Sequence, residues 1–121
     1  MIPFGQESVT LYHREETADA QGRTTLTWRR ILLDGCSWRH AARYSLSNAD
    51  EVVCRVPAGQ MRPSVGDGMI LGSVDDEVGS AVALAELLAA HRQQGRAFRV
   101  AAVNDNVRKG FPLAHYAARG K

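Results

Sequence analysis

The sequence predicts a mainly β fold: a small antiparallel β-barrel or sandwich with one α-helix packed on it. Several short stretches alternate apolar and polar residues, which is the period of strands half buried against a core. A single stretch, at about residues 80–94, has helical spacing instead. The 121 residues contain no internal repeat and no linker, so residues 1–121 are expected to form a single domain.

The first third of the chain is expected to form three strands, at residues 9–13, 24–33 and 36–40. Residues 15–23 are polar and without a period, and they contain a glycine near their end, which is typical of a hairpin loop. The pair at residues 34–35, Asp-Gly, is a frequent tight-turn sequence in hairpins. These segments together predict an antiparallel meander.

The rest of the sheet is expected from four shorter runs, at residues 52–56, 69–71, 98–103 and 113–118. Two loops are expected among these segments. Residues 41–50 show no period, and residues 58–68 contain three glycines and a proline. The Asn-Asp-Asn sequence at residues 104–106 is expected to turn the chain before its last strand.

The helix is expected to begin after Ser80, a good N-cap residue, and to end before Gly95. The acidic run at residues 75–77 precedes it, where negative charge suits the positive end of the helix dipole. The stripe that faces the sheet is expected to consist of Leu84, Leu87, Leu88 and His91.

The buried core is expected to contain the inward positions of these elements. These positions are Leu11, Trp28, Trp38, Val52, Val56, Leu84, Leu88, Phe98 and Val100. Cys36 and Cys54 lie in apolar strands and are expected to be buried free thiols.

Composition excludes several classes of protein. Hydrophobic residues make up 45% and charged residues 23% of the chain, which is typical of a globular protein and not of a disordered one. Fifteen Lys and Arg residues are scattered among 13 acidic ones, so the net charge of +2 gives little support for a polyanionic partner. The sequence shows neither an apolar run of membrane-spanning length nor a signal peptide, so the protein is expected inside a cell and away from membranes.

We expect no catalytic residues, no metal site and no cofactor. The chain has no nucleophile-elbow, phosphate-loop or zinc-protease motif. Cys36 and His40 would share a strand face but lie roughly 13 Å apart, too far for two ligands of one zinc ion. The acids at residues 75–77 lack the alternating spacing of a calcium loop. Trp28 and Trp38 occupy inward strand positions, which favours packing in the core over the stacking of bases.

Five short segments carry a resemblance that covers most of the chain. They are Val-Thr-Leu-Tyr-His-Arg at 9–14, Thr-Trp-Arg-Arg at 27–30, Gly-Cys-Ser-Trp at 35–38, Val-Asn-Asp-Asn at 103–106 and Leu-Ala-His-Tyr at 113–116. Their succession resembles small structural proteins of phages and prophages encoded among the head and neck genes. In architecture the chain also resembles head-completion, or stopper, proteins: small β-barrels that form a ring below the portal and adaptor.

The resemblance implies a head–tail connector subunit in the virion neck, assembled in the cytoplasm of the bacterial host. It implies a ring of six or twelve copies that contacts portal or adaptor proteins on one side and tail-tube or tail-terminator proteins on the other. Packaged DNA would pass through the ring without sequence-specific binding. Residues 41–50 correspond in position to the loop with which stopper proteins plug the channel.

Loops of such a subunit would serve as docking segments, and arginine and tyrosine are enriched at interface hot spots. The candidate interface residues are Arg43, Tyr44, Asn48 and Arg62. Two alternatives stay open. A tail-terminator or minor capsid protein would have the same gene neighbourhood. A small nucleic-acid-binding β-barrel would need surface aromatics among its basic residues, for which Tyr12, Tyr44 and Tyr116 are the candidates.

Overall fold

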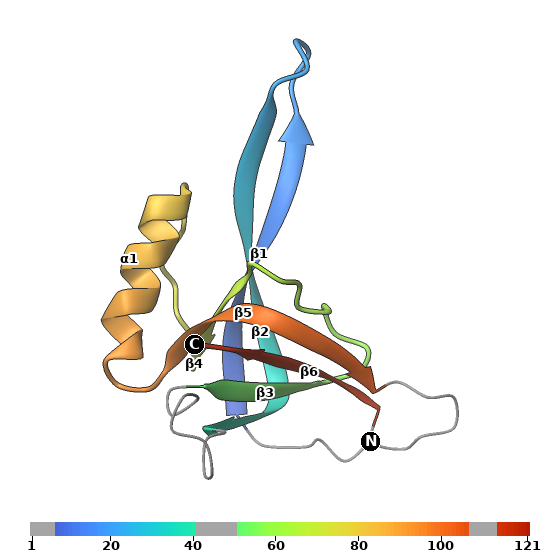
Figure 1. Ribbon diagram of the computed structural model, residues 1–121, viewed down its shortest axis with the longest axis vertical. Coiled ribbons are helices and arrows are strands. Elements are labelled where there is room, and N and C mark those ends of the chain that lie inside the picture. Colours follow the sequence, from blue (N-terminus) through green and yellow to red (C-terminus); the bar gives the residue numbers. More distant parts are fainter. Residues whose placement is uncertain (1–6, 41–50, 107–113) are drawn as a thin grey trace.

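The computed structural model describes residues 7–40, 51–106 and 114–121 and shows a closed antiparallel β-barrel of six strands with one helix outside it (Figure 1). The strand order around the barrel is β1-β2-β3-β6-β5-β4. The elements are β1 (Glu7–Ala18), β2 (Thr24–His40), β3 (Val52–Pro57), β4 (Gly68–Leu71), α1 (Ala81–Arg92), β5 (Ala97–Asn106) and β6 (His115–Gly120). The predicted mainly β fold with one helix is therefore confirmed, and the sheet closes as a barrel.

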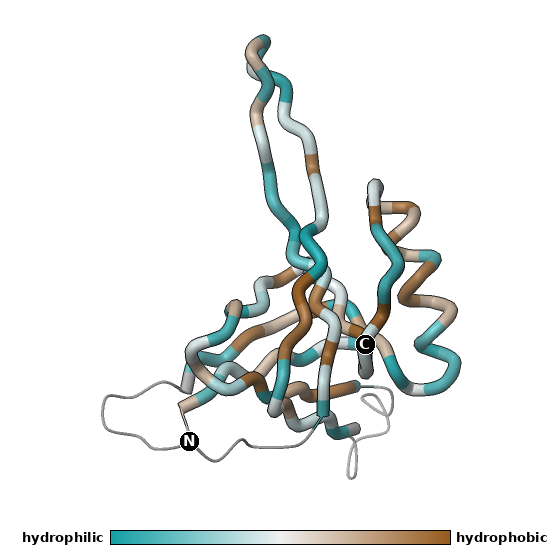
Figure 2. The backbone as a smooth tube through the Cα atoms, turned by 180° about the vertical axis from the view of Figure 1, so that it is seen from behind, coloured by the Kyte–Doolittle hydropathy of each residue, from teal (hydrophilic) through white to brown (hydrophobic). Residues whose placement is uncertain are grey.

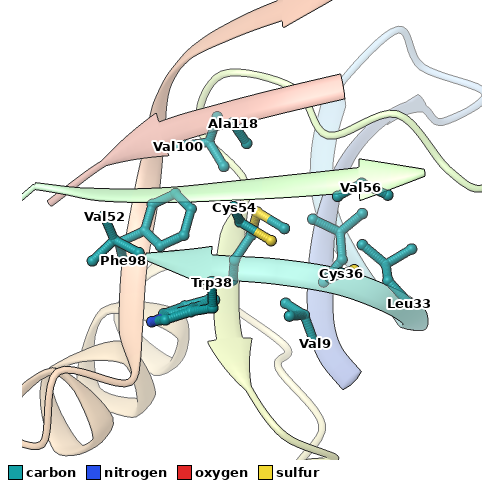
Figure 3. Packing of buried hydrophobic residues seen from close by; sticks show 12 residues of the cluster. Val9, Leu33, Cys36, Trp38, Val52, Cys54, Val56, Phe98, Val100 and Ala118 are labelled. Carbon is teal, nitrogen blue, oxygen red and sulfur yellow. The ribbon is translucent and has the colours of Figure 1, made fainter. Parts of the chain in front are cut away.

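The barrel is filled by alternate side chains from all six strands (Figure 3). Within this core the rings of Trp38 and Phe98 lie 5.2 Å apart at 58°, and the Trp38 indole N–H donates to the carbonyl of Gly95 at 3.3 Å. The buried members are Val9, Leu11, Leu33, Cys36, Trp38, Val52, Cys54, Val56, Met69, Phe98, Val100 and Ala118. The two cysteines are free and buried, as the sequence predicted.

A second apolar cluster lies outside the barrel, between α1 and the strands that it covers, and contains Tyr12 and Ile70. Leu84 and Leu88 of the predicted helical stripe are fully buried there, whereas Leu87 and His91 are half-buried. The helix sits directly on β4, because a Cβ atom at Gly68 would lie 2.9 Å from Leu84 Cδ1.

Ser80 is the N-cap of α1, as predicted, and its hydroxyl accepts from the Ala83 N–H at 3.1 Å. The acids at residues 75–77 lie before the cap, and the first turn of the helix contains no acid. Instead, Asp75 lies 3.8 Å from Arg30 of β2, and the Asp76 carbonyl accepts from the Tyr12 hydroxyl at 2.6 Å. These contacts tie the segment before the helix to the barrel wall.

The predicted hairpin between the first two strands is confirmed, but its loop is shorter than predicted: β1 continues to Ala18, which pairs with Thr24 at the start of β2. The second predicted connection was wrong. The predicted turn at Asp34-Gly35 lies inside β2, which pairs with β1 as far as Cys36 and with β3 from Ser37 onward. Gly35 has φ +69°, and the register shifts beside it, so the glycine serves an irregularity in a continuous strand.

Three smaller predictions also change. Residues 104–106 are not a turn but the end of β5, where Asn104 pairs with Ala117 of β6. The last strand runs over His115–Gly120, about two residues later than expected. Of the nine predicted core residues, all are buried except Trp28, which is half-buried in the outer cluster.

Within the described residues, no helix has the length and apolar character needed to cross a membrane.

Candidate functional site

The most prominent surface feature is a two-stranded ribbon that projects from the barrel (Figure 1), here called the arm and defined as residues 13–30. Tyr12↔Gly68 is the last pair between β1 and β4. Beyond it β1 pairs with β2 alone, from His13↔Arg29 to Ala18↔Thr24. The arm therefore has β structure but no barrel behind it.

The tip of the arm is a compact turn held by its own hydrogen bonds. The Asp19 carboxylate accepts from the N–H groups of Gln21 and Arg23 at 2.9 and 2.8 Å. Gly22 has φ +81°, a conformation that L side chains rarely adopt. This turn chemistry keeps the two strands in register without help from the barrel.

The two faces of the arm differ, because side chains alternate along paired strands. One face is wholly polar and consists of His13, Glu15, Thr17, Thr25, Thr27 and Arg29. The other face has apolar members along β2: Leu26 is 38% exposed, and Trp28 packs against the outer cluster. The Trp28 indole N–H is buried and has no hydrogen-bond partner among the described residues. Figure 2 shows the arm as largely hydrophilic, with isolated apolar positions.

The two strands of the arm also differ in charge. The β1 half carries Glu15 and Glu16 and leads into Asp19 at the tip, against one base, Arg14. The β2 half follows Arg23 and contains no acid; its charged residues are Arg29 and Arg30. Arg29 lies 4.0 Å from Glu15 across the ribbon, a loose pair with both side chains well exposed. The arm thus has an acidic side and a basic side.

A buried carboxylate fixes the base of the arm. Asp67, fully buried, accepts from the Arg14 N–H at 2.9 Å, from the Ser64 N–H at 2.9 Å and from His13 Nδ1 at 2.8 Å, with Nδ1 protonated. The loop before β4 is thereby bonded to the first residues of the arm. No described serine or cysteine side chain hydrogen-bonds to this imidazole, so the His13–Asp67 pair orients a ring without a nucleophile.

The loop at residues 58–68 is bonded to the barrel at several points. The Gln60 side-chain amide pairs with the backbone of Asp34, accepting from its N–H at 2.9 Å and donating to its carbonyl at 2.7 Å. The Gly66 N–H donates to the Val100 carbonyl at 2.9 Å. Of the two predicted docking loops, this one is therefore held in place within the subunit.

The candidate interface residues of the sequence are dispersed. Arg43, Tyr44 and Asn48 lie outside the described residues. Arg62 is on the surface and forms a bidentate pair with Asp105 of β5, with N–O distances of 2.7 and 3.1 Å. This guanidinium lowers the pKa of the Asp105 carboxyl, and the carboxylate raises the pKa of Arg62.

The described part of the chain offers little for catalysis or metal binding. It contains no group of three or more His, Cys, Asp or Glu side chains placed to hold a metal ion. Two shallow hollows flank the C-terminus, one beside Val52 and Arg92 and one beside Glu51 and Arg119. Neither lining combines a nucleophile with a base.

Sequence reasoning missed the arm and its anchor. Residues 15–18 gave no hydrophobic alternation, because both faces of a free ribbon are exposed. The available signal was length: the polar run before the turn matches in extent the threonine-rich run after it. No sequence pattern indicated that Asp67 is buried, because its burial depends on the path of a loop that the sequence alone does not predict.

In comparisons with known proteins, no curated protein and no solved structure matched the chain. A family model matched residues 4–121, nearly the whole length. The chain therefore belongs to DUF6751, a family of unknown function.

Proposed function

We propose that this protein is a structural subunit of a tailed phage or prophage-derived particle: a ring component of the head–tail connector, of the head-closure or stopper type. The observation that carries the proposal is the arm, a long ordered ribbon that leaves the barrel and whose outer part, residues 16–27, is exposed. Its partners would be copies of itself, a portal or adaptor protein, and a tail-tube or tail-terminator protein.

The physical argument concerns the low stability of a two-stranded ribbon that has no further strand or core beside it. An isolated two-stranded hairpin is marginally stable in water, and an unpaired edge invites association with another chain. Here the residues at the tip, from Glu16 to Leu26, are exposed and contribute to neither apolar cluster. A subunit of a larger assembly gains a docking element from such a ribbon, since neighbours cover it.

The barrel supplies the rigid base that such a docking element needs. Every strand of the barrel has a neighbour on both sides, and Asp67 bonds the first residues of the arm to the loop before β4. In a ring, packaged DNA would pass through the channel and meet the protein without sequence-specific binding. The side chains of Arg43, Tyr44, Asn48 and Arg62 remain candidates for contacts with neighbouring subunits.

The nucleic-acid alternative is less well supported by the aromatic residues. Stacking of bases needs aromatic rings on the surface. Tyr12 is fully buried and Trp38 is 8% exposed, while Trp28 packs beside α1. Tyr116 is half-buried against the barrel core. Within the described residues, no exposed row of aromatics lies among the basic side chains.

Deletion of the gene from an inducible prophage, followed by electron microscopy of the lysate, tests the proposal. A head-closure role predicts tail-less heads that have lost their DNA, together with free tails of normal length. Tails of abnormal length would instead indicate a tail terminator, and the absence of normal heads would indicate a minor capsid protein. Wild-type numbers of infectious particles would contradict all three structural roles.

A complementation assay then assigns the role to the arm. We expect a variant in which Asn-Gly replaces residues 16–26 to express as a folded barrel but fail to restore joined particles. The matched control is Val82→Ala, a truncation at a side chain that is 67% exposed on the outer side of α1. Full complementation by the shortened arm would contradict the argument.

A further inference from the structure

The backbone of the arm has two free edges. The Arg14 N–H, which donates to Asp67 Oδ1, points away from β2. Arg14 is directly opposite Trp28, and both residues of such an antiparallel pair point their N–H and C=O groups outward. The alternation of outward-pointing residues continues along β2 to Asp34, whose backbone N–H and C=O groups bond to the Gln60 side chain on the outer side of the strand. On β2 the backbone N–H and C=O groups that point away from β1 are therefore those of the alternate residues Leu26, Trp28, Arg30 and Leu32. On β1 the groups that point away from β2 include those of Glu16 and Ala18.

No described residue pairs with these outward groups. β2 pairs with β3 only from Ser37 to His40, and β1 pairs with β4 only up to Tyr12. The Gln60 side chain covers the β2 edge at Asp34, just below the free stretch. An exposed row of backbone donors and acceptors is a template for an added strand.

The two free edges carry opposite charge. Along the β1 edge two acids, Glu15 and Glu16, stand against one base, Arg14, and Asp19 lies at the end of that edge. The β2 edge has no acid: Arg23 and Arg29 lie along it, with Arg30 at its base, where Arg30 already lies 3.8 Å from Asp75. Two identical edges placed side by side would bring like charges together, and like charges directly opposite are destabilising. The β1 edge of one copy complements the β2 edge of another, and this pairing is of the heterologous kind that closes into rings.

We propose that the occupant of the free β2 edge is a second copy of this chain, whose β1 edge adds as an antiparallel strand. All arms of a ring project in one direction, and within each arm β1 and β2 run in opposite directions. The contact between the β2 edge of one copy and the β1 edge of the next, here called the seam, is therefore antiparallel, like the β1–β2 pairing within each arm. Repeated around the ring axis, the arms form one continuous antiparallel sheet above the barrels. This inference rests on the proposed ring, and it names the surface that holds the ring together.

A charge-swap experiment on the full chain tests the seam. One variant makes both edges basic (Glu15→Lys with Glu16→Lys), and the other makes both edges acidic (Arg23→Glu with Arg29→Glu). Each should fold, because Glu16, Arg23 and Arg29 are exposed, the Glu15 side chain is 41% exposed, and the Arg29–Glu15 pair is loose at 4.0 Å. Circular dichroism and the melting temperature check the fold before association is measured.

Sedimentation velocity at low and high salt measures association. We expect wild-type chains to self-associate more strongly at low salt. Each variant alone should associate more weakly, by on the order of tenfold, because like charges would meet at the seam. An equimolar mixture should regain association, since the two variants can alternate around a ring. The matched control, Glu86→Lys with Arg92→Glu on α1, should leave association unchanged.

Several results would overturn the seam. They are a wild-type chain that stays monomeric at all accessible concentrations, variants that associate like wild type, and a mixture that does not recover. A loss confined to the acidic variant would indicate that the β2 edge binds an acidic surface other than the β1 edge. Failure here is distinguishable from failure of the proposed function. Chains found in the neck with unpaired arms contradict only the seam, and rings that never enter a particle contradict only the neck role.

Discussion

At the scale of single residues, Asp67 is the side chain at the base of the arm whose removal should reduce the stability of the protein most. Asp67→Ala removes the acceptor for two backbone N–H groups and for His13 Nδ1. We expect a loss of about 3 kcal/mol in the free energy of unfolding, because buried donors would lose a charged acceptor. Urea denaturation measures the change, and Asp105→Ala, at an exposed ion pair, should leave the midpoint nearly unmoved.

Gly120 makes a second residue-scale prediction, because the backbone of β5 passes too close for any side chain there. A Cβ atom on Gly120 would overlap the carbonyl of Arg99 and touch the ring of Phe98. Gly120→Ala should therefore destabilise the barrel by about 1–3 kcal/mol, as overpacking does. Gly79→Ala, where a Cβ meets no atom within 4 Å, is the control in the same thermal melt. Equal melting temperatures for the two variants would show that β5 and β6 separate easily.

The two thiols should be unreactive while the barrel is folded. Cys36 and Cys54 are both fully buried, and a hydrogen bond with Cys36, together with burial, raises the pKa of Cys54. A raised pKa lowers the fraction of thiolate, which is the reactive form. With a chromogenic disulfide reagent at pH 8, we expect no titration of native protein and two thiols after addition of denaturant. Rapid reaction without denaturant would mean that β2 and β3 open locally.

At the scale of elements, sequence predicted best those segments that have one face on a core. Residues 52–56, and the helix that begins after Ser80, were located to within a residue or two, because burial imposes their period. The prediction failed where contacts with residues distant in the sequence determine the local conformation. The Asp-Gly pair at 34–35 stays in a strand because Gln60 and β1 hold both sides of it, and residues 104–106 stay extended because β6 pairs with them.

The candidate site was predictable only in part for a related reason. The sequence located most of β2, but the arm needs a second strand whose residues have no buried face. Arg62 was predicted only as a candidate interface residue, and its pairing with Asp105 depends on a contact between residues 43 positions apart. Such a contact follows from the barrel topology and leaves no trace in local sequence.

The outer part of the arm, residues 16–26, should contribute little to the stability of the barrel. Replacing residues 16–26 by Asn-Gly connects the paired residues Glu15 and Thr27 through a two-residue turn and leaves Trp28 in its cluster. We expect the urea midpoint to change little, because the deleted side chains are exposed and lie in neither apolar cluster. Leu84→Ala, at a fully buried helix position, should instead cost about 2–5 kcal/mol in the same assay. A large loss from the shortened arm would show that the ribbon supports the fold.

At the scale of the whole molecule, two regions of different stability share one pair of strands. Within the barrel every strand has two neighbours, and one apolar cluster fills the interior while a second is covered by α1. In the arm the same strands have only each other. Local opening should therefore be frequent at the tip and rare in the barrel, although β1 and β2 are continuous through both.

Hydrogen exchange followed by mass spectrometry measures this difference. In the free subunit we expect the outward amides of Glu16, Ala18, Leu26 and Trp28 to exchange at nearly unprotected rates, because no described group accepts from them. Amides of β3 and β6, which lie between neighbours on both sides, should exchange only on global unfolding. If neighbouring copies pair along the arm, the same outward amides should become protected in assembled rings while the barrel amides change little. Arm amides that exchange equally fast in both states would mean that assembly uses some other surface.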